Sequence, residues 1–557
     1  MIEAASVAGP FRPAARQSSG RPPILDTKTR FIRRLVGRVL KPASSGLSVF
    51  GDSRVGAVVA ARTAVEAIAQ VRSALKGTLP ARVIELRLDF LSNRREIARF
   101  LRWLALQKKI PTLIATCRRR GAGGHFRGST AGEIAVLQQA VAAGCAWCDI
   151  EIETAEHLDA RQLKNALAPA RLLISAHDFK RLPRDLPALV RRLEAYRGEA
   201  IKIAAAARSL ADVRRLLEPA RDRSNVVIVP MGEDITAARI LALREGSALA
   251  YAPVAQSTAP GQIGFEELER VYRLRRPFGK TEGINSQTGV YGVIGNPIAH
   301  SLSPLMHNAA FAAGRHNAVY LPFGVRELPD FIAAIEPFRI AGFSVTIPHK
   351  QRIIRYLDEC DPLAAEIGAV NTVAVRAGKL CGYNTDFIGV LRAIERRLPL
   401  SSSFVLLVGA GGVARAAAFA LARAGARVSI WARRGQQVRA LAGAVGGVAI
   451  EREEIARQSF DAIVNCTPVG MHPSGGSPLE SRELNCSLVM DLVYRPLRTE
   501  LLRRAERRGI ETISGVDMFV AQGVAQWELW MGESAPAALM RRVVLAALQR
   551  EQKSRRR

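Results

Sequence analysis

The chain has 557 residues, of which 48% are hydrophobic and 23% are charged. At roughly 100–200 residues per domain, this length excludes a single small module and predicts two or more globular domains. No uninterrupted apolar run reaches the ~18 residues that a membrane-spanning helix needs, so we expect no membrane partner.

The charge balance is strongly basic, with 80 Lys and Arg against 50 Asp and Glu and a formal net charge of +30. A positive net charge is compatible with binding to nucleic acid, to an anionic surface or to acidic small molecules, and it does not distinguish among these partners. Residues 1–47 hold nine Lys or Arg against two acidic residues. We interpret residues 1–47 as a disordered basic arm and residues 549–557 as a basic tail, and we do not favour a nucleic-acid partner.

The arm has a second interpretation, because its Arg-rich, Ser-containing and acid-poor composition is also typical of an organelle transit peptide. High Arg and Ala content elsewhere in the chain favours a plain extension. We therefore expect a cytoplasmic protein, with a plastid location as the alternative.

The seven cysteines are too scattered for a disulfide scaffold and predict a reducing compartment. Cys145 and Cys148 have the C-x-x-C spacing, but they lie in the apolar stretch GCAWCDIEI, which favours a buried strand over a zinc or redox site. We expect no metal site.

Eight short apolar runs recur in the first half of the chain. They lie at 55–60, 82–89, 112–117, 145–152, 172–177, 200–205, 226–231 and 248–254, and Ala-, Leu- and Arg-rich segments with helical spacing separate them. Alternating strands and helices predict a parallel sheet, and the length suits a (β/α)8 barrel over residues 48–275.

Reactive groups of such a barrel lie where its strands end. Polar side chains stand at or after these ends in seven places: Glu85, Arg87, Arg118, His177, Lys202, Arg239 and Gln262. Any one of them could be a satisfied polar residue or a surface ion pair, but seven on one rim favour a site.

Lys202 is the strongest candidate for a catalytic residue among them, because the residues after it are small or apolar. Desolvation favours the neutral amine, which can attack a ketone and form an imine. His177 titrates near neutrality and could carry the proton that an adjacent C–H then loses. Arg118 and Arg239 could hold a carboxylate by paired hydrogen bonds.

These residues resemble the type I 3-dehydroquinate dehydratases. The similar motifs are ELR at 85–87, SAHDF at 175–179, IKIA at 201–204, MGEDITAAR at 231–239 and TAPGQI at 258–263. The resemblance implies that Lys202 forms the imine and that His177 is the acid and base. It also implies a set of substrate-binding residues, namely Glu85, Arg87, Arg118, Arg239, Thr258 and Gln262.

One position departs from that family. Where the family commonly has a glutamate that helps to position the histidine, RRRGAGG places Ala122. We expect a slower or differently supported dehydratase, helped by Asp149 or Glu151. At Thr258 the family's serine is replaced, but the hydroxyl is kept.

After a polar linker at 276–288, the sequence changes character. The stretch 404–425 predicts an apolar strand, a glycine turn and an Ala-rich helix, with Gly409, Gly411 and Ala414 at the G-x-G-x-x-A spacing. A second strand at 427–432 follows at the distance that a Rossmann unit requires, and the turn lets a pyrophosphate approach the helix N-terminus.

The second strand ends in Trp431-Ala432-Arg433-Arg434, where an NAD-preferring site usually has an acidic residue. Two guanidinium groups there would attract a 2′-phosphate, so the expected cofactor is NADP(H). The alternative is that both arginines are merely solvated in an Arg-rich protein.

Loops rich in Gly, Pro and small polar residues surround this unit, at 292–308, 342–350, 368–373, 382–389, 465–471, 491–502 and 515–523. Together they resemble the shikimate dehydrogenases over about residues 289–548. The resemblance implies that Lys350 and Asp386 form the catalytic pair and that Ser301 and Ser303 bind the substrate carboxylate. It places Thr346, Asn371, Tyr494 and Gln522 around the ring hydroxyls, and Gly409, Gly411, Gly412, Ala414, Arg433, Arg434, Asn465, Thr467 and Met471 at the cofactor.

The predicted fold class is therefore α/β, with a barrel followed by a two-domain dehydrogenase: a shikimate-binding domain at 289–395 and a Rossmann NADP-binding domain with returning helices at 396–548. The predicted function is the conversion of 3-dehydroquinate to 3-dehydroshikimate, without a cofactor, and its NADPH-dependent reduction to shikimate. Two alternatives remain: a barrel that only senses metabolites, and an NAD-dependent enzyme that oxidises quinate or shikimate. The sequence leaves the oligomeric state open.

Overall fold

The computed structural model describes residues 49–50, 53–76, 79–232, 236–255, 262–272, 274, 277–278 and 281–554. The expected arm at 1–47 and Thr258 lie outside these residues. No described helix combines the length and apolarity that a membrane crossing requires.

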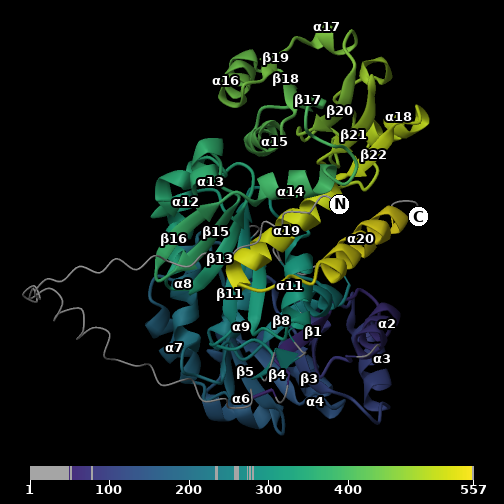
Figure 1. Ribbon diagram of the computed structural model, residues 1–557. Helices are drawn as coiled ribbons and strands as arrows, with labels where there is room; N and C mark the ends of the chain where they lie inside the picture. Colours follow the sequence, from purple (N-terminus) through teal and green to yellow (C-terminus); the bar gives the residue numbers. More distant parts are fainter. Residues whose placement is uncertain are drawn as a thin grey trace, which may run out of the picture. The chain divides into compact units, whose positions relative to one another are not determined.

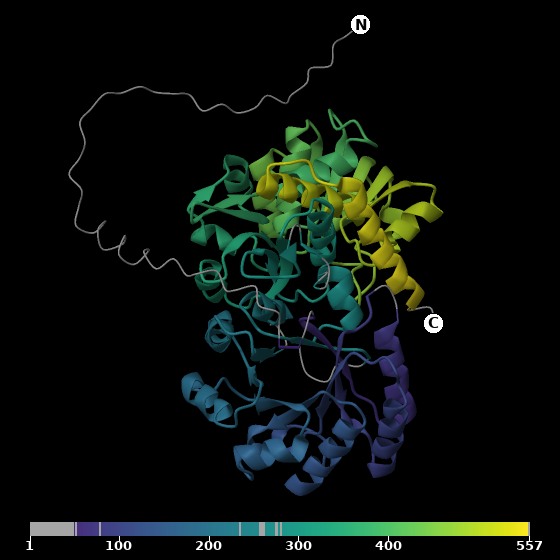
Figure 2. The same cartoon turned by 90° about the horizontal axis from the view of Figure 1, so that it is seen from below.

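All eight expected strands are present in the first half of the chain. They are β1 (Val55–Val59), β2 (Val83–Arg87), β3 (Thr112–Thr116), β4 (Trp147–Glu151), β5 (Arg171–Asp178), β6 (Ala200–Ala206), β7 (Val226–Met231) and β8 (Ala250–Pro253). Neighbours pair in parallel from β1 to β7, and β8 returns to pair with β1, which makes a nearly closed barrel. Figure 2 shows the helices, purple to blue, outside these strands.

The barrel helices are α2 (Ala64–Leu75), α3 (Arg94–Ala105), α4 (Thr130–Ala142), α5 (Ile152–Ala155), α6 (Ala160–Leu167), α7 (Leu186–Glu194), α8 (Leu210–Leu217), α9 (Thr236–Arg244) and α10 (Phe265–Glu267). Several begin at a residue whose side chain accepts a hydrogen bond from the first turn, as Asn93 does at α3 and Ser209 at α8. The sequence thus fixes where these helices start.

The inside of the barrel is layered because side chains alternate along a strand. The layer nearest the start of the strands, which we call the floor, is apolar. It contains Phe50, Val58, Val83, Ile114, Trp147, Leu173, Ala200, Val227 and Tyr251. Two residues further along β2, β4 and β5 stand the buried polar residues Glu85, Asp149 and Ser175. The period of two therefore places a polar layer directly on an apolar floor.

Residues 276–288, expected to be a linker, contain a short antiparallel pair, β9 (Pro277–Phe278) with β10 (Thr281–Glu282). The next domain has a mixed sheet in the order β12-β11-β13-β15-β16-β14. Its strands are β11 (Gly289–Gly295), β12 (Ala318–Gly324), β13 (Ile340–Val345), β14 (Glu359–Cys360), β15 (Thr372–Arg376) and β16 (Lys379–Tyr383), and its helices are α11 (Ser303–Ala313), α12 (Leu328–Ile335), α13 (Pro362–Ile367) and α14 (Thr385–Ile394).

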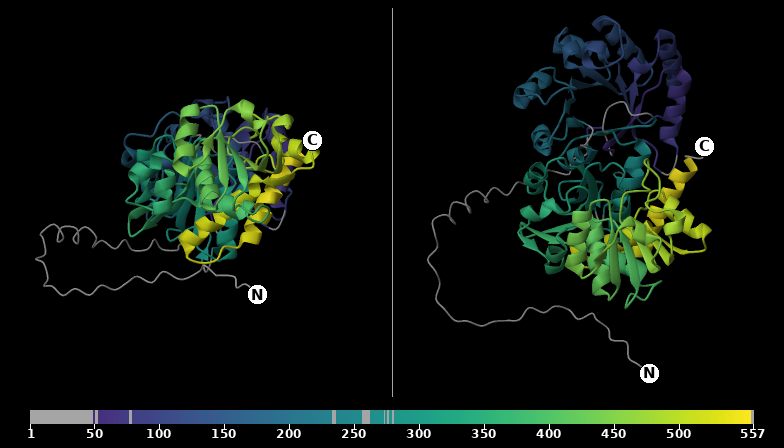
Figure 3. Two further views of the ribbon diagram at one scale, coloured as in Figure 1. Left: turned by 45° about the horizontal axis from the view of Figure 1, so that its top comes forward. Right: turned by 90° about the horizontal axis from the view of Figure 1, so that it is seen from above.

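The last domain is a parallel sheet in the order β19-β18-β17-β20-β21-β22, which is the strand order of a Rossmann fold. Its strands are β17 (Phe404–Val408), β18 (Arg427–Trp431), β19 (Val448–Ala449), β20 (Phe460–Asn465), β21 (Cys486–Asp491) and β22 (Glu511–Ser514). Its helices are α15 (Gly412–Arg423), α16 (Gly435–Val445), α17 (Arg452–Ile455) and α18 (Glu500–Arg507). Figure 3 shows this sheet in light and yellow green.

Two long helices then return to the preceding domain. Helix α19 (Gly515–Met531) contacts α14, and α20 (Ala537–Ser554) contacts α11 (Figure 1). Residues 549–554, which we expected in the basic tail, are helical and continue α20.

Candidate active sites

The polar layer of the barrel is centred on Lys202, the third residue of β6. Its side chain is 5% exposed, and its Nζ donates to Asp149 Oδ2 at 2.8 Å and to Glu85 Oε1 at 3.4 Å. The same nitrogen lies 4.3 Å from the centre of the Tyr251 ring. The burial expected from the sequence is present, but the amine lies inside the strand rather than at its end and has two carboxylate neighbours.

Asp149 is one of the residues that sequence reasoning placed only in a supporting role. Burial acts to raise its pKa, but Lys202 and Arg118 outweigh burial and hold that pKa well below its usual range. Asp149 also accepts a hydrogen bond from Ser175 Oγ at 2.5 Å. A charged carboxylate at this position stabilises a cation on the Lys202 nitrogen, whether that cation is an ammonium or a protonated imine.

Tyr251 was missed altogether. Its hydroxyl is buried and has no hydrogen-bond partner among the described residues, and burial raises its pKa well above the usual value. The apolar run ALAYAPV that contains it predicts only a strand, so no sequence signal distinguishes it from the other core residues.

His177 lies near the end of β5, one strand from Lys202. Burial lowers the pKa of His177 well below its usual value, and the positive charges of Arg118 and Lys202 act in the same direction. Its Nδ1 is 3.0 Å from Glu151 Oε1, which leaves Nε2 for another partner. A lowered pKa keeps the imidazole in its neutral form, which is the form that can act as a base.

Two of the predicted substrate-binding arginines are engaged by carboxylates of the barrel. Arg118 donates through Nε to Glu151 at 3.2 Å and through Nη2 to Asp149 at 3.3 Å. Arg87 makes a two-pronged pair with Asp89, with both distances 2.9 Å. These ion pairs hold the two guanidinium groups in place.

The remaining barrel predictions lie in less regular segments. Arg239 is buried in α9, and burial lowers its pKa to about 10. Gln262 is half-buried, before α10. Ala122 is half-buried in the turn after β3, and its methyl side chain cannot form a hydrogen bond with His177. The carboxylate that contacts the His177 ring is that of Glu151.

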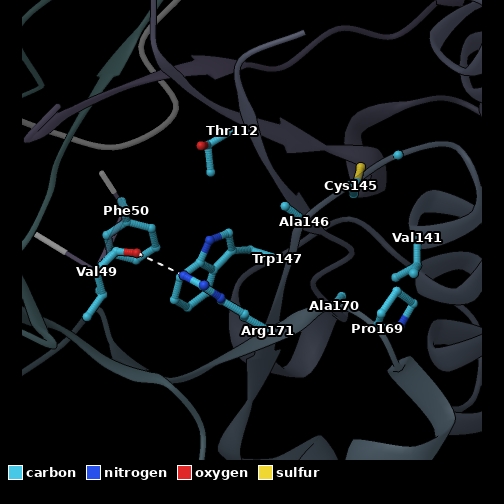
Figure 4. A pocket seen from close by; sticks show the side chains of 11 residues that line it. Val49, Phe50, Thr112, Val141, Cys145, Ala146, Trp147, Pro169, Ala170 and Arg171 are labelled. Atoms are coloured by element: carbon cyan, nitrogen blue, oxygen red, sulfur yellow. Dashed lines mark hydrogen bonds between the residues drawn. The ribbon is translucent and has the colours of Figure 1, made fainter. Parts of the chain in front are cut away.

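A cavity of about 590 Å³ lies away from these residues, at the other end of the barrel (Figure 4). Thr112, Trp147 and Arg171, the first residues of β3, β4 and β5, line it, and Arg171 donates to the Val49 carbonyl at 3.4 Å. None of the predicted site residues lines this cavity.

The second site lies in the dehydrogenase part. Lys350 Nζ donates to Asp386 Oδ2 at 2.5 Å, and Asn371 Nδ2 donates to the other oxygen, Oδ1, at 2.8 Å. Asn371 is itself held by Thr385, whose backbone N–H donates to Asn371 Oδ1 at 2.7 Å. The structure therefore brings together the predicted pair Lys350 and Asp386 and orients both groups.

The predicted carboxylate and ring contacts form a second group. Ser303 begins α11, and its backbone N–H donates to Ser301 Oγ at 3.3 Å. Tyr494 stacks on Phe519 with ring centres 4.5 Å apart and makes a hydrogen bond with the backbone of Leu302, between the two serines. Thr346 follows β13, half-buried.

Gln522 lies on α19, the returning helix. Its side chain donates to the Phe519 carbonyl at 2.8 Å, and it lies so close to α14 that a Cβ added at Gly389 would meet its Cβ at 3.1 Å. Gln522 is mostly buried at this helix contact.

Behind these residues runs a buried network that the motifs did not reveal. Tyr320 OH contacts Ser344 Oγ at 2.6 Å, and Ser344 donates to Gln526 Oε1 at 2.9 Å. Gln526 in turn donates to Thr372 at 3.1 Å. Ser344 thus joins β12 and β13 to α19.

The glycine turn after β17 fits a dinucleotide. Gly409 has φ of +120°, and a Cβ there would meet Thr467 Cγ2 at 3.2 Å, whereas a Cβ at Gly411 would meet no atom within 4 Å. A Cβ at Gly412 would lie 3.4 Å from Lys350 Cβ, so the turn adjoins the predicted catalytic lysine. Ala414 is buried in the helix that follows.

The far side of the nucleotide site carries Arg433 and Arg434, both exposed and directly after β18. Asn465, at the end of β20, donates to Asp491 at 2.9 Å and accepts from Thr467 Oγ1 at 2.7 Å. Met471 is 46% exposed. The segment 431–434 therefore carries two exposed cations and no acidic side chain.

Taken together, a barrel with a buried lysine between two carboxylates and a nucleotide-binding fold with a lysine–aspartate pair define a chain with two enzyme halves, a lyase and an NADP-dependent oxidoreductase. The type I 3-dehydroquinase family matches residues 56–278. The shikimate dehydrogenase substrate-binding domain matches residues 293–373, and the shikimate 5′-dehydrogenase C-terminal domain matches 515–545.

Similar proteins cover both halves. The chain is 35% identical, over 487 residues, to the chloroplastic bifunctional 3-dehydroquinate dehydratase/shikimate dehydrogenase of Arabidopsis thaliana, covering 83% of this chain and 79% of that protein. It is 42% identical to the NADP(+) shikimate dehydrogenase of Moorella thermoacetica, over 48% of this chain and 95% of that one. A solved Thermus thermophilus shikimate 5-dehydrogenase with NADP(H) and shikimate is 36% identical, with a TM-score of 0.44, over 47% of this chain and 100% of that chain.

The chain belongs to the family of bifunctional 3-dehydroquinate dehydratase/shikimate dehydrogenases. Its halves are a type I 3-dehydroquinate dehydratase and an NADP-dependent shikimate dehydrogenase of the shikimate pathway.

Proposed function

We propose that Lys202 and His177 carry the dehydration and that Lys350 and Asp386 carry the reduction, so that the product of the barrel becomes the substrate of the dehydrogenase. The observation that supports this most directly is the burial of Lys202 beside Asp149, one strand from a neutral His177.

In the barrel, the Lys202 nitrogen attacks the ketone carbon of 3-dehydroquinate, and the ketone oxygen leaves as water. The resulting imine carries a positive charge, which Asp149 stabilises at the distance at which it now holds the amine. His177 removes a proton from the carbon next to the imine, the electrons move toward nitrogen, and the ring hydroxyl departs with the proton that His177 returns. Hydrolysis of the imine then frees Lys202 and 3-dehydroshikimate.

Substrate binding in the barrel requires a cationic rim for the carboxylate. We assign this role to Arg239, with Arg87, Arg118, Glu85, Thr258 and Gln262 completing the contacts. Arg118 and Arg87 are held in place by their own carboxylate partners, so they present oriented N–H groups and lose little side-chain entropy on binding.

In the dehydrogenase half, Ser301 and Ser303 bind the carboxylate of 3-dehydroshikimate, and Thr346, Asn371, Tyr494 and Gln522 bind around the ring hydroxyls. NADPH, when bound at the Gly409 turn with its 2′-phosphate on Arg433 and Arg434, supplies a hydride to the ketone carbon. Lys350 stabilises the developing alkoxide and donates a proton to it, while Asp386 holds the ammonium in place.

The test is a coupled assay on the whole chain. Given 3-dehydroquinate and NADPH, the protein should consume NADPH without added dehydratase. Borohydride added with 3-dehydroquinate should trap an adduct on wild-type protein and none on Lys202→Ala. Lys350→Ala is the matched control, since it should abolish reduction and leave the adduct. NADPH consumption with 3-dehydroshikimate but none with 3-dehydroquinate would refute the barrel assignment.

We further propose a cytoplasmic location, because Arg and Ala are enriched throughout the chain and not in residues 1–47 alone. The alternative is an organelle, as in the chloroplastic relative. The intact mass of the isolated protein distinguishes the two, because import would remove the arm.

A further inference from the structure

Three carboxyl or hydroxyl side chains connect the amine to the imidazole in the barrel. Asp149 accepts from Lys202 at 2.8 Å, Ser175 Oγ lies 2.5 Å from Asp149 Oδ1 and 3.1 Å from Glu151 Oε2, and Glu151 Oε1 lies 3.0 Å from His177 Nδ1. All of these side chains are buried. This continuous path is the feature that the assigned roles of Lys202 and His177 leave unexplained.

Glu151 has the geometry of a residue that orients an imidazole. It faces Nδ1, so that it directs Nε2 away from itself, and it would stabilise the imidazolium that forms when His177 takes a proton. Only an ionised carboxylate supplies that stabilisation, because a protonated one carries no charge. The ionisation of Glu151 therefore matters for the base step.

Ionising Glu151 in this place is costly. Burial raises the pKa of Glu151 to about 7, whereas Arg118 and the Ser175 hydroxyl act in the opposite direction. Charged groups face the Glu151–His177 pair from several elements: Arg118 after β3, Asp149 on β4, Lys202 on β6, Arg87 on β2, Glu133 on α4 and Glu153 on α5. Ser175 is an uncharged group that lowers the pKa of Glu151, and a small substitution removes its hydroxyl.

From this arrangement we propose that Glu151 is the positioning residue of His177 and that Ser175 keeps Glu151 ionised by sharing its hydroxyl between Asp149 and Glu151. The hydroxyl carries a single proton, which it can donate to either carboxylate but not to both at once. Ser175 therefore couples the carboxylate that contacts the amine to the one that contacts the imidazole. This inference rests on the proposed roles of Lys202 and His177 in dehydration.

The test follows dehydratase kcat across pH 6–9 in two variants. Ser175→Ala removes one hydrogen bond to a charged group and should raise the pKa of Glu151 by about one unit, so that kcat falls about tenfold at pH 6 and recovers by pH 9. Glu151→Gln keeps the shape but has no carboxylate to ionise, so its loss of about a hundredfold should persist at pH 9. KM should change little in either variant.

Three further measurements separate positioning from structural damage. Borohydride trapping at Lys202 should be retained in both variants, and reduction of 3-dehydroshikimate by the same chains reports an intact protein. Thr116→Val is the matched control: its hydroxyl donates to Glu85 at 2.9 Å in the same layer but does not touch Glu151, so the midpoint of its pH profile should match wild type.

An unshifted midpoint in Ser175→Ala, or a wild-type kcat in Glu151→Gln, would overturn the inference. Absence of a trapped adduct in the wild-type protein would instead refute the proposed role of Lys202, so the two failures are distinguishable.

Discussion

Arg433 and Arg434 are the two residues to which we assign the choice between NADPH and NADH. Both are exposed at the end of β18, where the ribose of a dinucleotide lies in a Rossmann fold. Exposed guanidinium groups contribute little to folding, yet each can form charge-assisted hydrogen bonds with a phosphate. Their effect should therefore appear in cofactor affinity rather than in stability.

The corresponding prediction is that Arg433→Ala combined with Arg434→Ala raises KM for NADPH about tenfold or more and changes KM for NADH little. Steady-state kinetics with both cofactors and 3-dehydroshikimate would measure this. Arg439→Ala is the control, because it removes the same charge from an exposed position of α16. Equal turnover with NADH and NADPH in the wild-type protein would contradict the argument.

At the scale of single elements, the turn from β17 to α15 depends on the backbone of Gly409. A side chain at φ of +120° is strained, and its Cβ would also press on Thr467. Gly409→Ala should lower both NADPH affinity and melting temperature. Gly443→Ala is the matched control: it lies within α16 with no atom near an added Cβ and should stabilise the protein by about 0.5–1 kcal/mol.

NADPH titration by fluorescence and thermal denaturation would measure both variants. A Gly409→Ala protein that binds NADPH as tightly as wild type would show that the turn tolerates a side chain.

The strands and helices could be predicted from the sequence better than the contacts between them. The eight barrel runs and the β17–α15–β18 unit follow from apolar runs and turn residues, because these signals are local in sequence. Contacts between strands were not predictable in the same way. The pairing of Lys202 with Asp149 depends on the stagger of β6 against β4, which no single segment encodes.

The same limit applies to Glu151 and Tyr251. Their alternation along β4 and β8 predicts which side faces inward, but the partner that each meets is set by closure of the barrel. The small and apolar residues after Lys202 led us to expect a desolvated amine. The structure instead surrounds it with two carboxylates and an aromatic ring.

For the whole molecule, the net charge of +30 should act on substrate capture. The substrates are carboxylates and NADPH carries phosphates, so a positive field raises their rate of encounter. Raising salt from about 0.01 M to about 1 M shortens the screening length from roughly 30 Å to roughly 3 Å.

We expect kcat/KM to fall severalfold over that range for both activities, most steeply for NADPH, while kcat changes little. Initial rates at several concentrations of an inert salt would measure this. A flat response for NADPH would show that the excess charge lies too far from the sites to matter.

The apolar floor beneath Lys202 determines by which end of the barrel substrate, product and water enter and leave. Packed rings such as Trp147 and Phe50, with centres 4.5 Å apart, close the described barrel from below. Everything that enters or leaves the site must then pass through the other end of the barrel, by which 3-dehydroquinate binds. This includes the water released when the imine forms, the water that hydrolyses the imine, and the product. The product must leave before the next molecule of 3-dehydroquinate can bind, so 3-dehydroshikimate should inhibit the dehydratase competitively.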